Sequence, residues 1–208
     1  MVEQQLELPN IIDYKKDKWE IKISYDECPD SPRTWDNLGE IFVSNGCKYT
    51  SNETSIDFDE FTTHDADQDQ ARLEAMGFIA LPLSVYDHSG VSIYIGGKRD
   101  KWDSGQIGFY IVSKEKIKEE YKVKRISKKL RQRIEKVLIN EINTYNDYIN
   151  GNVYGFQLMH NDKEEDSCYG FYGDNCLSEM YEYFPDEFCK NFTVEEAKAL
   201  ATWPWDSK

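Results

Sequence analysis

The sequence predicts an α+β fold in which an antiparallel sheet packs against one long amphipathic helix, with short helices beside it. Three observations lead to this prediction. Apolar runs before residue 112 have the pattern of strands, residues 127–148 repeat apolar side chains every three or four positions, and two more strand-like runs follow. Aromatic residues make up 14% of the chain, which excludes an intrinsically disordered protein.

The predicted strands begin at residues 19–25, where Trp, Ile and Tyr alternate with Glu, Lys and Ser, as in a strand with one buried face. Residues 40–44 form a short strand. Residues 78–86 are the most apolar run, a core strand in which Pro82 predicts a bulge or an edge position. Two further runs complete the antiparallel group: residues 91–95 and 107–112.

Capping residues locate the predicted short helices. Asp65, with Gln68 three residues later, begins a helix that Gly77 ends. Ser113 caps a second helix near residues 114–121.

The long helix runs from about residue 127 to 148 and stops at Gly151. Its apolar stripe is formed by eight side chains: Ile126, Leu130, Ile134, Val137, Leu138, Ile142, Tyr145 and Ile149. After this helix, residues 153–159 and 167–172 predict a hairpin around an acidic turn at 161–166.

The length of the chain suits a single domain over residues 1–208. Residues 1–17 are expected to form a loose lead-in, and the polar, acidic stretch 46–63 an exposed loop or insertion. Near the end of the chain, residues 174–184 predict a helix, and Thr193 caps a last short one.

Charge is distributed unevenly along the chain. Residues 114–136 hold eleven Lys or Arg against four Glu, a net charge of +7. The whole chain has 25 basic and 39 acidic residues, so the remainder has a net charge of −21. Such acidity disfavours DNA and anionic lipid as partners of the whole chain, and it permits binding to basic protein surfaces.

Cysteine content and apolar runs bear on the compartment. The five cysteines are an odd number without a CxxC pair, the N-terminus lacks the apolar region of a secretory signal, and no apolar run approaches the ~20 residues of a membrane span. Reduced thiols in a cytoplasm, without a membrane partner, are therefore expected. The oligomeric state is left open.

A hydrolase or nuclease site is one function that the sequence permits. Its candidate residues flank two successive strands: Asp87, His88, Asp103, Ser104 and Gln106. An Asp near a His can orient or charge the imidazole, and Ser104 or Ser89 would then act as nucleophile. The alternative is turn chemistry, because Asp-His-Ser-Gly and Asp-Ser-Gly also suit tight connections. Adjacent residues of an extended chain point to opposite faces, which separates the side chains of Asp87 and His88.

No metal or cofactor is expected. Asp65, Asp67 and Asp69 begin like a calcium-binding loop, but the positions that require Gly and Glu hold Gln and Met. The three histidines are scattered along the chain. Gly96-Gly97-Lys98 lacks the spacing of a phosphate-binding loop.

The basic segment suggests nucleic-acid binding through a helix face over residues 124–136. The alternative is a solvated face whose charges pair with acidic residues elsewhere in the chain. The basic face is formed by six side chains: Lys124, Arg125, Lys128, Lys129, Arg131 and Arg133.

Four separated motifs run through the chain: DSPRTWDNLG at 30–39, LPLSVYDHSG at 81–90, WDSGQIG at 102–108 and DSCYGFYG at 166–173. In order and spacing they resemble an uncharacterised family borne by phages and prophages, from about residue 28 to 174. The resemblance implies a viral accessory protein in the cytoplasm of a bacterial host. It assigns no catalytic residue.

Small phage accessory proteins often counter host defence, and by analogy the first function expected is inhibition without catalysis. An acidic surface would occupy the basic groove of a host defence or nucleic-acid-processing protein. The acidic side chains expected on this surface are Asp57, Asp59, Glu60, Asp65, Asp67 and Asp69.

Overall fold

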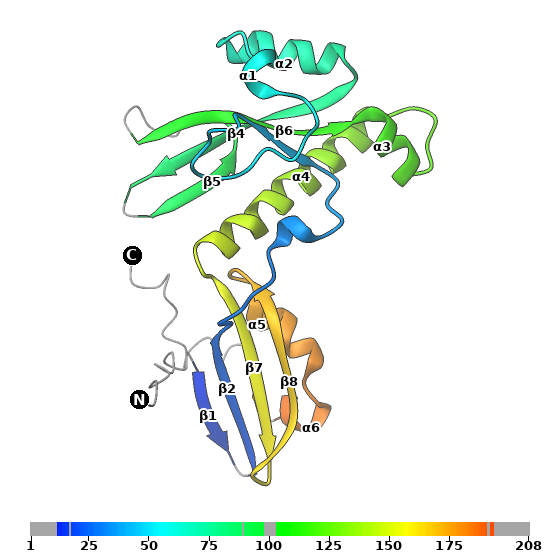
Figure 1. The fold of residues 1–208 in the computed structure, drawn as a ribbon. Coiled ribbons are helices and arrows are strands. Elements are labelled where there is room, and N and C mark those ends of the chain that lie inside the picture. The colour runs from blue at the N-terminus through cyan, green and yellow to red at the C-terminus, as the bar shows by residue number, and fades with distance from the viewer. Residues whose placement is uncertain (1–11, 17, 89, 98–102, 191, 194–208) are drawn as a thin grey trace. The chain divides into compact units, whose positions relative to one another are not determined.

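The computed structural model describes residues 12–16, 18–88, 90–97, 103–190, 192 and 193 (Figure 1). Its contacts form two compact units, which we call the central unit (residues 31–150) and the terminal unit (residues 1–30 and 151–208). Each unit has an antiparallel sheet of four strands with helices, which confirms the α+β fold class. These contacts define two units but do not show whether the units fold as one domain, so a single domain over 1–208 stays a prediction.

The sheet of the central unit has the strand order β3-β6-β4-β5, with every neighbouring pair antiparallel. Its strands are β3 (Glu40–Val43), β4 (Phe78–Asp87), β5 (Val91–Ile95) and β6 (Ser104–Ser113). Along β3, Ile41 and Val43 join one apolar cluster while Phe42 joins another. Since successive side chains of a strand point to opposite faces, this sheet is buried on both faces.

The long helix α4 (Lys128–Ile149) covers one face of this sheet, together with the short helix α3 (Lys114–Glu120) (Figure 1). Both helices begin at a serine whose hydroxyl oxygen accepts a hydrogen bond from a backbone N–H of the first turn, as predicted for Ser113. Ile134, Leu138 and Ile142 of the predicted stripe are fully buried in the cluster beneath α4.

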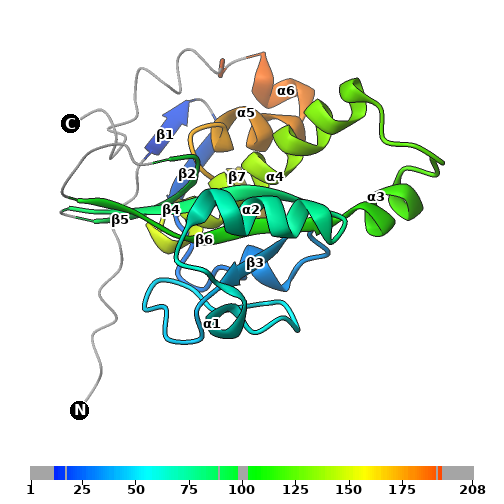
Figure 2. The ribbon, with the colours of Figure 1, turned by 90° about the horizontal axis from the view of Figure 1, so that it is seen from above.

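The opposite face is covered by α1 (Phe58–Phe61) and α2 (Ala66–Ala75), and in Figure 2 α2 runs across β4 and β6. The apolar cluster under them holds six buried side chains: Phe42, Phe61, Leu73, Ala80, Phe109 and Ile111. The Asp65 carboxylate accepts hydrogen bonds from the N–H groups of Asp67 and Gln68, so the predicted N-cap of α2 is confirmed. The central unit is therefore a sheet between two helical layers.

β4 pairs with β6 along nearly its whole length but with β5 only from Leu83 to Asp87, so Pro82 has a strand neighbour on one side only. The register of β4 against β6 shifts between Leu83 and Ser84, which leaves Ile107 of β6 without a partner residue. The bulge lies next to Pro82 and the local edge position lies at Pro82 itself, so both features that this proline predicts are present.

The terminal unit has the strand order β1-β2-β7-β8, again all antiparallel. Its strands are β1 (Ile12–Lys16), β2 (Trp19–Tyr25), β7 (Val153–His160) and β8 (Lys163–Tyr172). The helices α5 (Cys176–Met180) and α6 (Asp186–Cys189) add apolar side chains to the core under the sheet. Phe184 and Phe188 pack there edge to face, with ring centroids 5.2 Å apart.

Several local expectations for the terminal unit need correction. Residues 12–16 form β1 and pair with β2, so the lead-in prediction is wrong there. The hairpin turn is Asn161–Asp162 alone, with φ of 53° and 60°, which suits a two-residue turn. The acidic residues 164–166 belong to β8 (Lys163–Tyr172), an edge strand that leaves them exposed.

The remaining helices differ from expectation in extent. Residues 174–184 contain the shorter α5 followed by one 3₁₀ turn (Tyr181–Tyr183), and α6 lies where no helix was predicted. The stretch 46–63 is irregular, as predicted, except for α1. The helix predicted after Thr193 lies outside the described residues.

Two glycines of β6 give a matched test of the central sheet. A Cβ added at Gly108 would clash with the backbone oxygen of Phe42 and a methyl group of Val43, whereas a Cβ at Gly105 meets nothing within 4 Å. Gly108→Ala is expected to lower the free energy of unfolding by about 1–3 kcal/mol. Gly105→Ala should leave it unchanged or raise it slightly. Urea unfolding of both variants measures the difference, and equal stabilities would contradict the packing of β3 against β6.

Candidate functional site

The ends of β4 and β6 bring together part of the predicted catalytic set. Tyr86 pairs with Ser104, and the N–H of Asp87 donates to the carbonyl oxygen of Asp103 at 2.9 Å. The expectation that the two loops are neighbours is therefore confirmed. His88 Nδ1 lies 3.4 Å from Asp103 Oδ2, in a pair whose side chains are 64% and 41% exposed.

Asp87 points away from His88 toward the loop before α1, as the alternation of an extended chain predicts. Its Oδ2 accepts hydrogen bonds from the Tyr49 hydroxyl (2.8 Å) and from Lys48 Nζ (3.1 Å). These two hydrogen bonds hold the pKa of Asp87 below its ordinary value. The carboxylate thus attaches the loop at 48–49 to the end of β4, a structural use of this residue.

The other members of the predicted catalytic set lie in different surroundings. Ser104 is buried, and the Gln106 side chain donates to the carbonyl oxygen of Gly108. Ser89 lies outside the described residues. The described members give an exposed His–Asp pair on a surface turn, and a catalytic role for them stays a prediction.

The acidic surface predicted on α1 and α2 is present for five of its six residues. Asp57 and Asp65 are exposed and cap the two helices through hydrogen bonds from backbone N–H groups. Three more acids are exposed in the first turns: Asp59, Glu60 and Asp67. These five residues and their helices form what we call the acidic layer.

Asp69 is the exception, since it is buried with 3% of its surface exposed. Its carboxylate accepts hydrogen bonds from both hydroxyl groups of Thr62 and Thr63 and from the Thr63 N–H. Burial alone would raise the pKa of Asp69, but these hydrogen bonds outweigh it and lower the pKa below its ordinary value. Asp69 therefore joins α1 to α2, and its assignment to the acidic surface is wrong.

Among the residues that the structure describes, no group of three or more His, Cys, Asp or Glu side chains could hold a metal ion. The three aspartates at the start of α2 show why spacing alone misleads. Asp65 is used as a helix cap and Asp69 is turned inward to two threonines, so they do not share a site.

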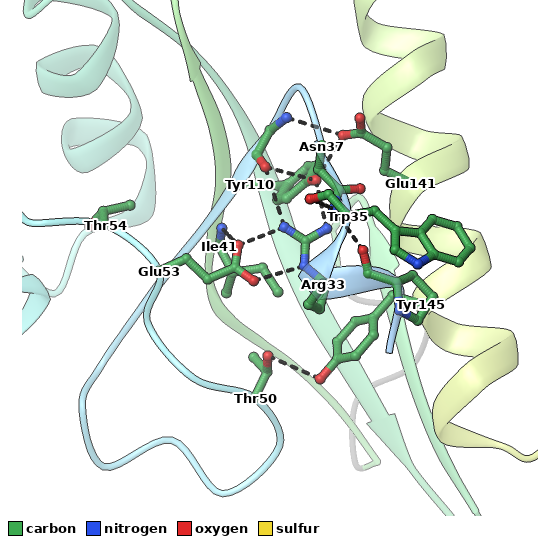
Figure 3. A network of polar contacts seen from close by, with 12 residues as sticks. Arg33, Trp35, Asn37, Ile41, Thr50, Glu53, Thr54, Tyr110, Glu141 and Tyr145 are labelled. Carbon is green, nitrogen blue, oxygen red and sulfur yellow. Dashed lines mark hydrogen bonds and ion pairs between the residues drawn. The ribbon is translucent and has the colours of Figure 1, made fainter. Parts of the chain in front are cut away.

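A partly buried polar network around Arg33 was not predicted from the sequence (Figure 3). The Arg33 guanidinium forms a two-pronged ion pair with Glu53, at 2.7 and 2.6 Å, and its Nη1 donates to the Tyr110 hydroxyl. Its side chain is 11% exposed. Glu53 also accepts a hydrogen bond from the N–H of Ile41 in β3. The ion pair thus fixes residues 31–39 and the loop at 53 against the sheet.

Glu141 of α4 completes this network on the helix side. Its two carboxylate oxygens accept hydrogen bonds from the N–H groups of Leu38 and Gly39, and Oε2 lies 2.8 Å from the Tyr110 hydroxyl. Burial, with the nearby Glu141 carboxylate, raises the pKa of Tyr110, so its hydroxyl remains protonated at neutral pH. Figure 3 shows these groups converging from the loop, the sheet and α4. Their roles are structural.

An open groove of about 970 Å³ lies between α4 and the chain segment that follows α3. We call the apolar side chains of its lining the floor and the four basic ones the rim: Arg125, Lys129, Arg133 and Lys136. The lining also includes one acid, Glu135, which pairs with Arg131. The apolar members are Tyr121, Val123, Leu130 and Ile139, of which Ile139 is 39% exposed. We call this feature the basic groove. The predicted basic face contributes three of its rim residues.

The basic residues of 114–136 divide into two groups by their contacts. Arg131 forms ion pairs with Glu74 and Glu135, so it belongs to the structure of the unit. Lys114, Lys116 and Lys118 also contact carbonyl or carboxylate oxygens. Within the described part of the chain, the seven others form no ion pair: Lys122, Lys124, Arg125, Lys128, Lys129, Arg133 and Lys136. Internal pairing therefore explains only part of the basic segment.

Comparisons with models of protein families, with curated proteins and with solved structures return no match. In the described residues, no helix is long and apolar enough to cross a membrane. Functional inference for this chain therefore rests on the surfaces described above.

The Arg33–Glu53 ion pair gives a stability prediction. Glu53→Ala leaves a largely buried guanidinium without its two charge-assisted hydrogen bonds, which is expected to lower the free energy of unfolding by about 2–3 kcal/mol. Glu40→Ala, at an exposed position of β3, is the matched control and should change it by less than about 0.5 kcal/mol. Chemical denaturation measures both, and equal small effects would show that the network is dispensable.

The lowered pKa of the Asp69 carboxylate predicts that the stability of the fold depends on pH. Its folded-state pKa lies below the ordinary value of 3.8, so the charged carboxylate stabilises the fold above about pH 4, and this contribution disappears as pH falls through the folded-state pKa. The difference in Tm between wild type and Asp69→Asn should be largest at neutral pH and shrink below pH 3.8. Asp67→Asn, an exposed neighbour, should change stability by less than about 0.5 kcal/mol at neutral pH. A difference that persists unchanged into acid would contradict the assignment.

Proposed function

We propose that this protein is a non-enzymatic binding protein whose acidic layer contacts a basic surface on another protein. Following the family resemblance, it is a phage accessory protein of the bacterial cytoplasm that inhibits a host defence or nucleic-acid-processing protein. The observation that carries this proposal is the separation of charge in the central unit. Exposed acids gather on α1 and α2, while the basic residues of α4 lie on the other side of the sheet.

This separation matters because mixed charges on one face would cancel each other. The sheet lies between the two helical layers except at one end, where Arg131 of α4 pairs with Glu74 near the end of α2. The exposed acids Asp65 and Asp67 lie at the other end of α2, and the rise along the helix from Asp67 to Glu74 is about 10 Å, which is about one Debye length. Each face therefore presents its own potential to an approaching partner. The acidic layer keeps its negative field in spite of the +7 segment in the same unit.

The local geometry of the acidic layer also favours recognition. Asp57 and Asp65 bind the backbone N–H groups of their helices, which fixes the direction of both helix starts. The neighbouring exposed acids are thus held by a rigid backbone rather than a free loop, which reduces the entropy lost on binding. Charge complementarity of this kind increases association rate and specificity more than affinity.

The terminal unit adds to the acidity of the chain. It holds 8 basic and 20 acidic residues, whereas the central unit holds 17 and 19. The terminal unit has no basic segment of its own to offset this excess. Its acids extend the negative potential of the protein, which agrees with a basic partner.

A matched pair of variants tests the acidic layer. Asp59→Asn with Glu60→Gln removes two charges from α1, while Glu119→Gln with Glu120→Gln removes two exposed charges from the end of α3. A host protein captured from nuclease-treated lysate at about 50 mM salt should be lost at about 500 mM salt. The first variant should bind it about tenfold more weakly and the second as wild type does.

The readout is the affinity of the purified pair, measured after the captured protein is identified. Capture of no host protein, or equal weakening by both variants, would refute binding through the acidic layer. Thermal unfolding of the two variants controls for loss of fold.

A further inference from the structure

We propose that the basic groove is a second binding site, which holds an acidic amphipathic helix of a partner protein. This site lies on the face of the central sheet opposite the acidic layer, so it is independent of the function proposed above. If the groove does not bind a helix, the proposed binding through the acidic layer is unaffected.

The rim of the groove has positive charge that the described residues do not pair. Lys129, Arg133 and Lys136 form no ion pair among the described residues, although acidic residues outnumber basic ones in the chain. Arg133 lies over the Tyr121 ring at 5.5 Å, which orients its guanidinium at the rim. An occupant with carboxylates would find these cations unoccupied.

The position of these charges also opposes a general preference of helices. The positive end of a helix dipole lies at its N-terminus, where acidic residues are stabilising and basic ones are not. The first turn of α4 nevertheless contains no acid and begins with Lys128 and Lys129. The acidic layer obeys the preference, with acids in the first turns of α1 and α2. The departure at α4 points to a role in binding.

The floor of the groove distinguishes between kinds of anionic occupant. Ile139 is exposed on α4, with Leu130 and Val123 beside it in the lining. A phosphate backbone contacts the basic rim and leaves this apolar surface in water. An amphipathic helix covers it with apolar side chains spaced three and four residues apart, while its acids meet the rim. Burial of apolar surface and ion pairing then act together.

The dimensions fit such an occupant. Residues 129, 132, 133, 136 and 139 lie at intervals of three and four on one face of α4 and line the groove. Ten residues of helix rise about 15 Å, so the groove can hold nearly three turns of a partner helix. The volume of about 970 Å³ lies at the upper end of the range for binding pockets.

The test uses the full chain and fluorescence anisotropy with synthetic probes. The first probe is a labelled peptide of about 18 residues with leucines on one helical face and Asp and Glu on the flanks. The second has the same composition reshuffled so that no apolar face forms. The third and fourth are a single-stranded oligonucleotide and a short DNA duplex. We expect the amphipathic peptide to bind at least about tenfold more tightly than each of the others.

Neighbouring residues give the matched variants. Lys129→Glu and Lys128→Glu change the charge equally in the first turn of α4, where an acid is favourable for the helix, but only Lys129 lines the groove. Lys129→Glu should weaken binding of the amphipathic peptide about tenfold and Lys128→Glu less than about twofold. Ile139→Ser should weaken binding of the amphipathic peptide and leave binding of the reshuffled peptide unchanged.

Equal affinity for the two peptides would overturn the proposal, because charge alone would then explain binding. Tighter binding of an oligonucleotide, lost in Lys129→Glu, would assign the groove to nucleic acid instead. Absence of binding to the amphipathic peptide would also overturn it. Circular dichroism of each variant confirms that the helices are intact.

Discussion

The ion pair between Arg33 and Glu53 is the interaction on which the central unit depends. It joins the segment before β3 to the acidic loop, and through Tyr110 and Glu141 it reaches β6 and α4. Charges taken out of water cost free energy unless every polar atom finds a partner. Here Glu53 also accepts the Ile41 N–H, and the Glu141 oxygens accept two more backbone N–H groups. The network therefore determines where the loops lie as well as stabilising them.

The placement of the loops in turn determines where the charges of the unit are displayed. The loop held by Glu53 leads into α1 and α2, and Asp69 joins these two helices through Thr62 and Thr63. On the other face, Glu141 attaches residues 38 and 39 to the middle of α4, whose N-terminal half lines the basic groove. Both charged surfaces are thus displayed on elements that these partly buried polar contacts hold in place.

Local chemistry could be predicted from the sequence, because its causes lie within a few residues. The caps at Asp65 and Ser113, the alternation of residues 19–25 and the stripe of α4 each depend on neighbours in the chain. The Arg33 network could not be predicted, since Arg33 meets Tyr110 across 77 positions. Asp69 was misread for a related reason: its threonine partners lie before the helix, and the sequence gives no sign that it turns inward.

Charged residues were harder to place from the sequence, because their surroundings depend on distant parts of the chain. The acidic residues 164–166 were expected in a turn, but an edge strand with exposed side chains accepts such residues, and charge there opposes pairing with other chains. Asp87 and Asp103 were rightly expected to be neighbours, since their strands are adjacent. That Asp87 would bind Tyr49 and Lys48 could not be foreseen.

The two charged surfaces differ in what the fold itself gains from them. The acids of α1 and α2 cap helices or lie in first turns, so they stabilise the elements that display them. The unpaired lysines and arginines of α4 have no comparable benefit within the described chain, and two of them open the helix where the dipole disfavours cations. In our proposal, binding of an anionic partner recovers the free energy that this arrangement forgoes. The basic groove is therefore the surface whose composition folding explains least and binding explains best.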